Sequence, residues 1–162
     1  MASFDEHIRQ ATRNLSFLEQ ANRLPISYWD WQVTVAFYVG VHLINAHIVQ
    51  KSGLHYRSHE QVDGAINPYN PLSPIKLTEE DYLAYSKLQG LARRARYLIH
   101  DDLTNRMTDA QFTYDKHFAR AVRCLDTLLT FIKNEYGVSF PRLAFKCIEL
   151  NRITLSNFDV LK

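Results

Sequence analysis

The chain has 162 residues, of which 46% are hydrophobic and 22% charged, and its formal net charge is +2. This length and composition are those of one ordinary folded domain, and they exclude an intrinsically disordered chain. So small a net charge excludes nucleic-acid binding by bulk charge, so such a function would require a local basic patch.

Two helices are predicted in the first third of the chain. Residues 4–22 place apolar side chains three or four positions apart, which gives one stripe that faces a core. Residues 27–51 are apolar on almost every side, as is typical of a helix at the centre of a bundle. In this helix Gly40 is expected to allow a neighbouring helix to come close. The side chains expected to be buried in it include Trp31, Phe37 and Val41.

The same central segment contains the longest apolar stretch of the chain. Two histidines and an asparagine interrupt it, and it is shorter than the about 20 residues that span a bilayer. The N-terminal residues contain no apolar signal-peptide core, so we expect a cytoplasmic protein without membrane association. Cys124 and Cys147 form no CxxC pair and are expected to be free thiols.

A short third helix and a long fourth helix are predicted in the middle of the chain. Ser58 is a suitable N-cap, and Gln61 three residues later completes the signature of a capping box. After a proline-rich connection, residues 78–100 form the fourth predicted helix. Its first turn contains three acidic residues, which suit the helix dipole.

The fifth helix is predicted over residues 108–136, capped by Thr108 and ended by Gly137. Residues 138–162 show mixed patterning without a strand-like alternation, so we expect a short helix or an extended segment packed on the bundle. The predicted fold class is all-α, a four- to five-helix up-down bundle over residues 1–137 with a short C-terminal extension over residues 138–162.

The sequence contains no common cofactor or metal motif. It has no phosphate-binding GxxxxGK(S/T) loop, no GxGxxG and no GxSxG. His55 and His59 have the i, i+4 spacing of helical metal ligands, but no cysteine or carboxylate cluster completes a site. We therefore expect no metal and no cofactor. The simpler interpretation is that His42 is a core residue hydrogen-bonded to Tyr38, and that His59 anchors a loop.

The segment LARRARYLIH, residues 91–100, carries the candidate catalytic groups. Arg93, Arg96 and His100 share one helix face, and Arg94 lies on an adjoining face. An imidazole can transfer a proton near neutral pH, and a guanidinium can hold a phosphate by two parallel hydrogen bonds. This pairing is what metal-independent RNA cleavage needs. The alternative is a solvated basic helix end, since a basic last turn suits the helix dipole.

Two features of the chain resemble the HEPN superfamily of helical bundles. The first is WDWQVTVAFYVGVHLINAHIVQKSGLHYRSHEQ, which is similar to the W…FY…H…A…G…SH pattern of small bacterial and archaeal members. The second is the spacing of the family's Rx4–6H motif, with five residues between Arg94 and His100, or six after Arg93. An arginine–tyrosine pair, here Arg96 and Tyr97, also matches that small group.

The resemblance, which covers about residues 5–135, implies a four- or five-helix bundle that forms a homodimer. In ribonuclease members, the arginine and histidine of two subunits meet at the dimer interface and cleave RNA without a metal. Their usual partner is a nucleotidyltransferase in a toxin–antitoxin pair, or a larger defence complex. Other members have lost catalysis and act as binding or scaffold modules.

The resemblance supports two hypotheses. In the first, the protein is a metal-independent endoribonuclease, a toxin or defence effector. His100 is its general acid/base, Arg94 or else Arg93 binds the scissile phosphate, and the RNA's own 2′-hydroxyl attacks to leave a cyclic phosphate. In the second, it is a non-catalytic homodimeric module that binds a nucleotide or a partner protein.

One departure from the family pattern bears on this choice. The residue after the motif arginine is commonly Asn, Asp or His, whereas Ala95 follows Arg94 and Arg94 itself follows Arg93. This favours a structural role for the polar residues, as a cluster inside the bundle. The members of that predicted cluster are His42, His59, Arg96 and Tyr97.

Overall fold

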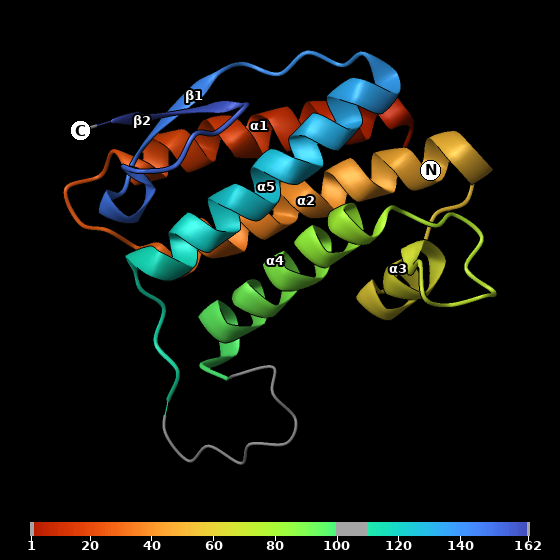
Figure 1. The fold of residues 1–162 in the computed structure, drawn as a ribbon, viewed down its shortest axis with the longest axis horizontal. Helices are drawn as coiled ribbons and strands as arrows, with labels where there is room; N and C mark the ends of the chain where they lie inside the picture. The colour runs from red at the N-terminus through yellow and green to blue at the C-terminus, as the bar shows by residue number, and fades with distance from the viewer. Residues whose placement is uncertain (1, 100–109, 162) are drawn as a thin grey trace.

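The computed structural model describes residues 2–99 and 110–161. These residues form five α-helices and a two-stranded sheet, and Figure 1 shows the sheet lying against the helical bundle. This confirms the predicted all-α fold class and the short C-terminal extension. The helices are α1 (Phe4–Asn22), α2 (Trp29–Ser52), α3 (His59–Ile66), α4 (Glu79–Tyr97) and α5 (Asp115–Tyr136).

α2 is the central helix, and α1, α4 and α5 pack against it. Phe37 is fully buried as predicted, and Val41 is partly buried. Trp31, however, is 64% exposed, so the prediction that it lies in the core is wrong. The reason is helical phase. Trp29, about 200° away around the helix, packs on Phe118 of α5 with ring centres 5.3 Å apart, and this turns Trp31 outward.

Two properties of α2 follow from its central position. A β-carbon on Gly40 would lie 2.9 Å from Leu88 Cδ2 and 3.3 Å from Leu128 Cδ1, so this glycine allows close helix approach, as predicted. By length and composition, α2 is also the one helix of the described chain that is apolar enough to cross a membrane. Of its most apolar window, 72% is buried inside the bundle.

The predicted capping box at α3 is half formed. The Ser58 hydroxyl accepts a hydrogen bond from the backbone N–H of Gln61 at 3.2 Å, as predicted. The Gln61 side chain instead accepts from the backbone N–H of Arg57 at 3.1 Å, one residue before the cap. Both partners still satisfy a donor near the start of the helix.

Two other helix ends differ from the prediction. α4 ends three residues earlier than predicted, where Leu98 adopts a left-handed conformation with φ 56°. α5 begins at Asp115, and the described residues 110–114 before it form no regular structure. The predicted cap at Thr108 lies outside the described residues. Gly137 ends α5 with φ 67°, as predicted.

The C-terminal extension, expected to be a short helix or an extended segment, contains two short strands and a 3₁₀ helix. β1 (Leu143–Lys146) pairs in parallel with β2 (Phe158–Leu161), and the 3₁₀ helix Ile148–Leu150 lies between them. Four residues are too few to show a clear period-two pattern, and pairing stabilises each strand more than local propensity does. Phe145 and Phe158 are buried and join the core of the bundle.

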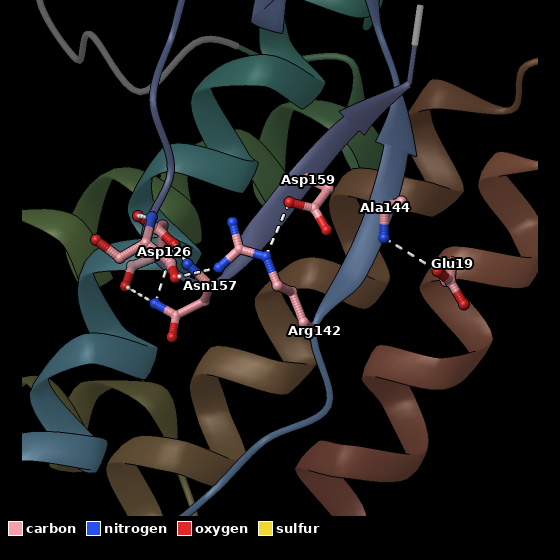
Figure 2. A network of polar contacts seen from close by, with 7 residues as sticks. Glu19, Asp126, Arg142, Ala144, Asn157 and Asp159 are labelled. Carbon is pink, nitrogen blue, oxygen red and sulfur yellow. Dashed lines mark hydrogen bonds and ion pairs between the residues drawn. The ribbon is translucent and has the colours of Figure 1, made fainter.

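Figure 2 shows how the extension is held to the bundle. Asp126 of α5 accepts hydrogen bonds from the backbone N–H groups of Ser156 at 2.9 Å and Asn157 at 2.7 Å. On the other side, Glu19 of α1 accepts one from the backbone N–H of Ala144 at 3.0 Å. The extension therefore ties the first helix of the bundle to the last.

Candidate anion-binding groove

A groove of about 820 Å³ lies between α4 and α5. The α4 wall carries Lys87 and Arg94, and the α5 wall carries Arg120 and Arg123. The other residues that line it are Ser86, Gly90, Leu91, His117 and Cys124. No carboxylate is among these described lining residues, so the groove is basic, with apolar groups between the cations.

The cations of the groove form two pairs, each with one member from α4 and one from α5. One pair acts electrostatically on His117 and the other on Cys124. His117 and Cys124 are seven residues apart on α5, which is about 10 Å along a helix. The pairs are Arg94 with Arg120 and Lys87 with Arg123. Positive charge therefore extends along about two turns of the groove.

None of the four groove cations makes an ion pair with a described carboxylate. The ion pairs found elsewhere in the described chain are Arg23–Glu19, Lys51–Glu135 and Arg142–Asp159. Like charges that share one groove repel one another, and a bound anion would reduce this repulsion. All four cations would therefore stabilise an anion in the groove.

His117 is buried in the first turn of α5 and lines the groove. Its Nδ1 accepts a hydrogen bond from the backbone N–H of Tyr114 at 2.9 Å, which caps the helix. An amide N–H can only donate, so Nδ1 is unprotonated and the neutral ring carries its proton on Nε2. Burial first, and then the charges of Arg94, Lys116 and Arg120, lower its pKa to about 4, so the ring is neutral at pH 7.

Arg94 binds the segment that precedes α5. Its Nε and Nη2 both donate to the carbonyl oxygen of Phe112, at 3.1 and 3.0 Å. These bonds hold the segment against the end of α4 and place the backbone N–H of Tyr114 against His117. The late start of α5 is therefore a tertiary effect, because a side chain of another helix keeps these residues out of the helix.

The structure places one of the three predicted catalytic residues in the groove. Arg94 lines it, whereas Arg93 is exposed and does not line it. His100 lies outside the described residues, so its pairing with Arg94 stays a prediction. Since two donors of the Arg94 guanidinium bind Phe112, they are not presented to a ligand in this structure.

The other groove residues were not predicted as a site from the sequence. Lys87 lies seven residues before Arg94, and Arg120 and Arg123 lie three and six residues after His117. Such spacings put each set on one side of its helix. The available signal was this pair of basic faces, but it becomes a site only when α4 and α5 are known to be neighbours.

Cys124, near the Lys87 end of the groove, is not an activated nucleophile. Burial raises the pKa of its thiol, although Lys87 and Arg123 act in the opposite direction. Cys147 is buried, and its Sγ lies 3.6 Å from the carbonyl oxygen of Asp115. Both cysteines are free thiols, which confirms the prediction that they are not bonded to each other.

Three of the four residues of the predicted polar cluster lie together, with Arg96 and His59 against Phe37 and Tyr97 against Arg96. The guanidinium carbon of Arg96 lies 5.8 Å from the centre of the Phe37 ring and 5.2 Å from that of Tyr97. The His59 ring lies 5.2 Å from the Phe37 ring. Tyr97 is 61% exposed, whereas His59 and Arg96 are half-buried and Phe37 is fully buried, so the group extends from the core to the surface of the bundle. His59 is the first residue of α3, not a loop residue.

His42, the fourth residue, lies in a different group. Its Nδ1 is 3.1 Å from Nδ1 of His7, so one ring donates to the other, and its partner is His7 and not Tyr38. His55 stacks on His7 with ring centres 5.3 Å apart. Even so, the described part of the chain contains no group of three or more His, Cys, Asp or Glu side chains that could hold a metal ion.

No known family model matches this chain, and no curated protein and no solved structure is detectably similar to it. The likeness to HEPN proteins therefore rests on its sequence motifs, and the groove between α4 and α5 has to be interpreted from its own geometry and charge.

Proposed function

We propose that this protein is a binding module that holds a phosphate-bearing ligand, a nucleotide or an RNA strand, in the groove between α4 and α5. The observation that carries the proposal is the presence of four cations and no carboxylate around this groove. Arginine can donate in parallel to two phosphate oxygens, and lysine adds a compact charge. Gly90 and Leu91, between the cations, offer apolar surface for a base or a sugar.

Two features of the groove favour binding over catalysis. Two donors of Arg94 are engaged by the carbonyl oxygen of Phe112. His117, the histidine that lines the groove, is neutral with its proton on Nε2, so this atom can donate a hydrogen bond but cannot accept a proton. A general base therefore does not face the groove from α5 in this state.

The proposal is tested with the double variant Arg120→Ala/Arg123→Ala. The matched control is Arg9→Ala/Arg13→Ala, which also removes two exposed arginines but lies on α1, on a different surface. Hydrogen bonds to charged groups contribute about 1.5–3 kcal/mol each, so the groove variant should bind a 5′-phosphorylated RNA oligonucleotide at least about tenfold more weakly. Fluorescence anisotropy measures this affinity. An equal loss in the control would indicate non-specific attraction and contradict the proposal.

A second candidate function is that of a metal-independent endoribonuclease, a cytoplasmic toxin or defence effector with a nucleotidyltransferase-type antitoxin as partner. The observation that favours it is that Arg94, the motif arginine, lines the basic groove. In this proposal His100 is the general acid/base, and Arg94, or else Arg93, holds the scissile phosphate. RNA cleavage in EDTA that is lost in a folded His100→Ala variant would support it, whereas an inert wild-type protein would contradict it.

Both proposals include a homodimer, which an exposed aromatic face of α2 supports. Trp31 and Tyr38, seven residues apart and so on one side of the helix, are 64% and 40% exposed. Aromatic side chains are enriched at protein interfaces. Light scattering should give twice the mass of the chain. A monomer at micromolar concentration would contradict this assembly.

A further inference from the structure

We propose that His117 binds a phosphate oxygen of the ligand, as a neutral hydrogen-bond donor at the end of the groove where α5 begins. This inference rests on the proposed function and adds the position and chemistry of one contact. His117 is 4% exposed and yet lines the groove, so a ligand atom that reaches the ring lies in the least water-accessible part of its wall. A hydrogen bond in such a place contributes more than one at an open surface.

The hydrogen bond at Nδ1 of His117 determines that Nε2 carries the proton of the neutral ring. Because the backbone N–H of Tyr114 occupies Nδ1, the ring cannot turn into the other tautomer without losing the cap of α5. In the described part of the chain, the hydrogen bond of the His117 ring is the one at Nδ1. Nε2 is not among the buried atoms that lack a partner, so water in the groove can solvate it in the free protein, and a ligand oxygen would replace that water.

The charged groups around the ring favour an anionic acceptor. Those that face it are Arg94 on α4 and, on α5, Asp115, Lys116 and Arg120. Three of these are cations and one is an anion, so the local field attracts negative charge. The ring also lies in the first turn of α5, a helix of 22 residues, where the helix dipole adds to that attraction. A phosphate dianion has only acceptor oxygens and so matches both the field and the donor.

Two variants separate ligand binding from helix capping. At this position glutamine can accept the Tyr114 N–H with its Oε1, as in a capping box, and can still donate from its Nε2. Methionine has a similar length and does neither. His117→Met should melt a few degrees lower because the cap is lost. It should also bind adenosine 5′-monophosphate about tenfold more weakly or worse. His117→Gln should recover most of both losses.

Calorimetry at a temperature well below melting measures the affinity of each variant. A purely structural histidine would change only the melting temperature of His117→Met, and an unchanged affinity would overturn the inference. If affinity survives in both His117 variants but falls in Arg120→Ala/Arg123→Ala, this inference fails and the proposed function stands. If it survives in all three, both fail.

Two further measurements do not depend on these variants. Nitrogen-15 NMR of the His117 ring should show the Nε2–H tautomer in the ligand-free protein, and an Nδ1–H tautomer would refute the inference. Inorganic phosphate is the second probe. Affinity within a few fold of the nucleotide's would support the contact and assign it to phosphate alone, whereas no binding of either probe would overturn it.

Discussion

Replacing Gly40 with alanine should destabilise the bundle, although alanine is the better helix former. In an open helix interior this change stabilises by about 0.8–1.0 kcal/mol. In α2, however, the new methyl group would lie 2.9 Å from Leu88 Cδ2 and 3.3 Å from Leu128 Cδ1, and both leucines are fully buried. Overpacking a core in this way costs about 1–3 kcal/mol. We therefore expect a net loss of about 1 kcal/mol and a Tm lower by about 2–4 °C.

Gly64→Ala is the matched control for this prediction. Gly64 lies in α3, and a β-carbon there would meet no atom within 4 Å, so the same substitution should stabilise the protein by the helix-propensity gain alone. Urea denaturation followed by far-ultraviolet circular dichroism gives the free energy of unfolding of both variants. If Gly40→Ala stabilised the protein as much as Gly64→Ala, α2 would not approach α4 and α5 as closely as the structure places it.

Arg96→Ala should lower the free energy of unfolding by about 1 kcal/mol, because its guanidinium packs against the ring of fully buried Phe37. Arg13→Ala, at an exposed position of α1, is the control, and equal losses in chemical denaturation would contradict the packing role. Acidification should destabilise the fold between pH 6.5 and about 4. Burial lowers the pKa of three histidines from 6.5 to about 4. The unfolded state therefore binds more protons in this pH range, and the free energy of unfolding decreases as the pH is lowered, by roughly 1–2 kcal/mol per histidine at pH 5. The three histidines are His7, His47 and His117. His47→Gln should flatten this dependence, and a pH profile unchanged by it would count against the buried neutral ring.

Much of the helical architecture was predictable because it is encoded over short distances. The apolar stripe of α1 and the all-round apolar surface of α2 can be read from consecutive residues, and Gly137 ends α5 by its own conformation. The start of α5 was not predictable in this way. It depends on Arg94, a residue of another helix, which binds the carbonyl oxygen of Phe112 and keeps the preceding segment out of the helix.

The candidate site was predictable only in part, for the same reason. The sequence motif predicted Arg94 as a site residue, and Arg94 does line the groove. The other three cations of the groove were not predicted, because ordinary solvated helix faces have basic residues at similar spacings. His117 gave no local signal, since its role depends on the backbone N–H of Tyr114 and on its burial against α4. The exposure of Trp31 shows the same limit, because hydrophobicity alone does not say which of two nearby tryptophans faces the neighbouring helix.

The attachment of β1 to α1 bears on the order in which this protein can fold while it is being made. The side chain of Asn22, at the end of α1, accepts from the backbone N–H of Lys146 at 2.6 Å and donates to its carbonyl oxygen at 3.3 Å, across 124 residues of chain. Residues 143–161 leave the ribosome only after all five described helices have done so, and contacts between segments so far apart form slowly. The helices of the nascent bundle therefore emerge with one side of α1 uncovered, and that side is completed only once residues 143–161 have also left the ribosome.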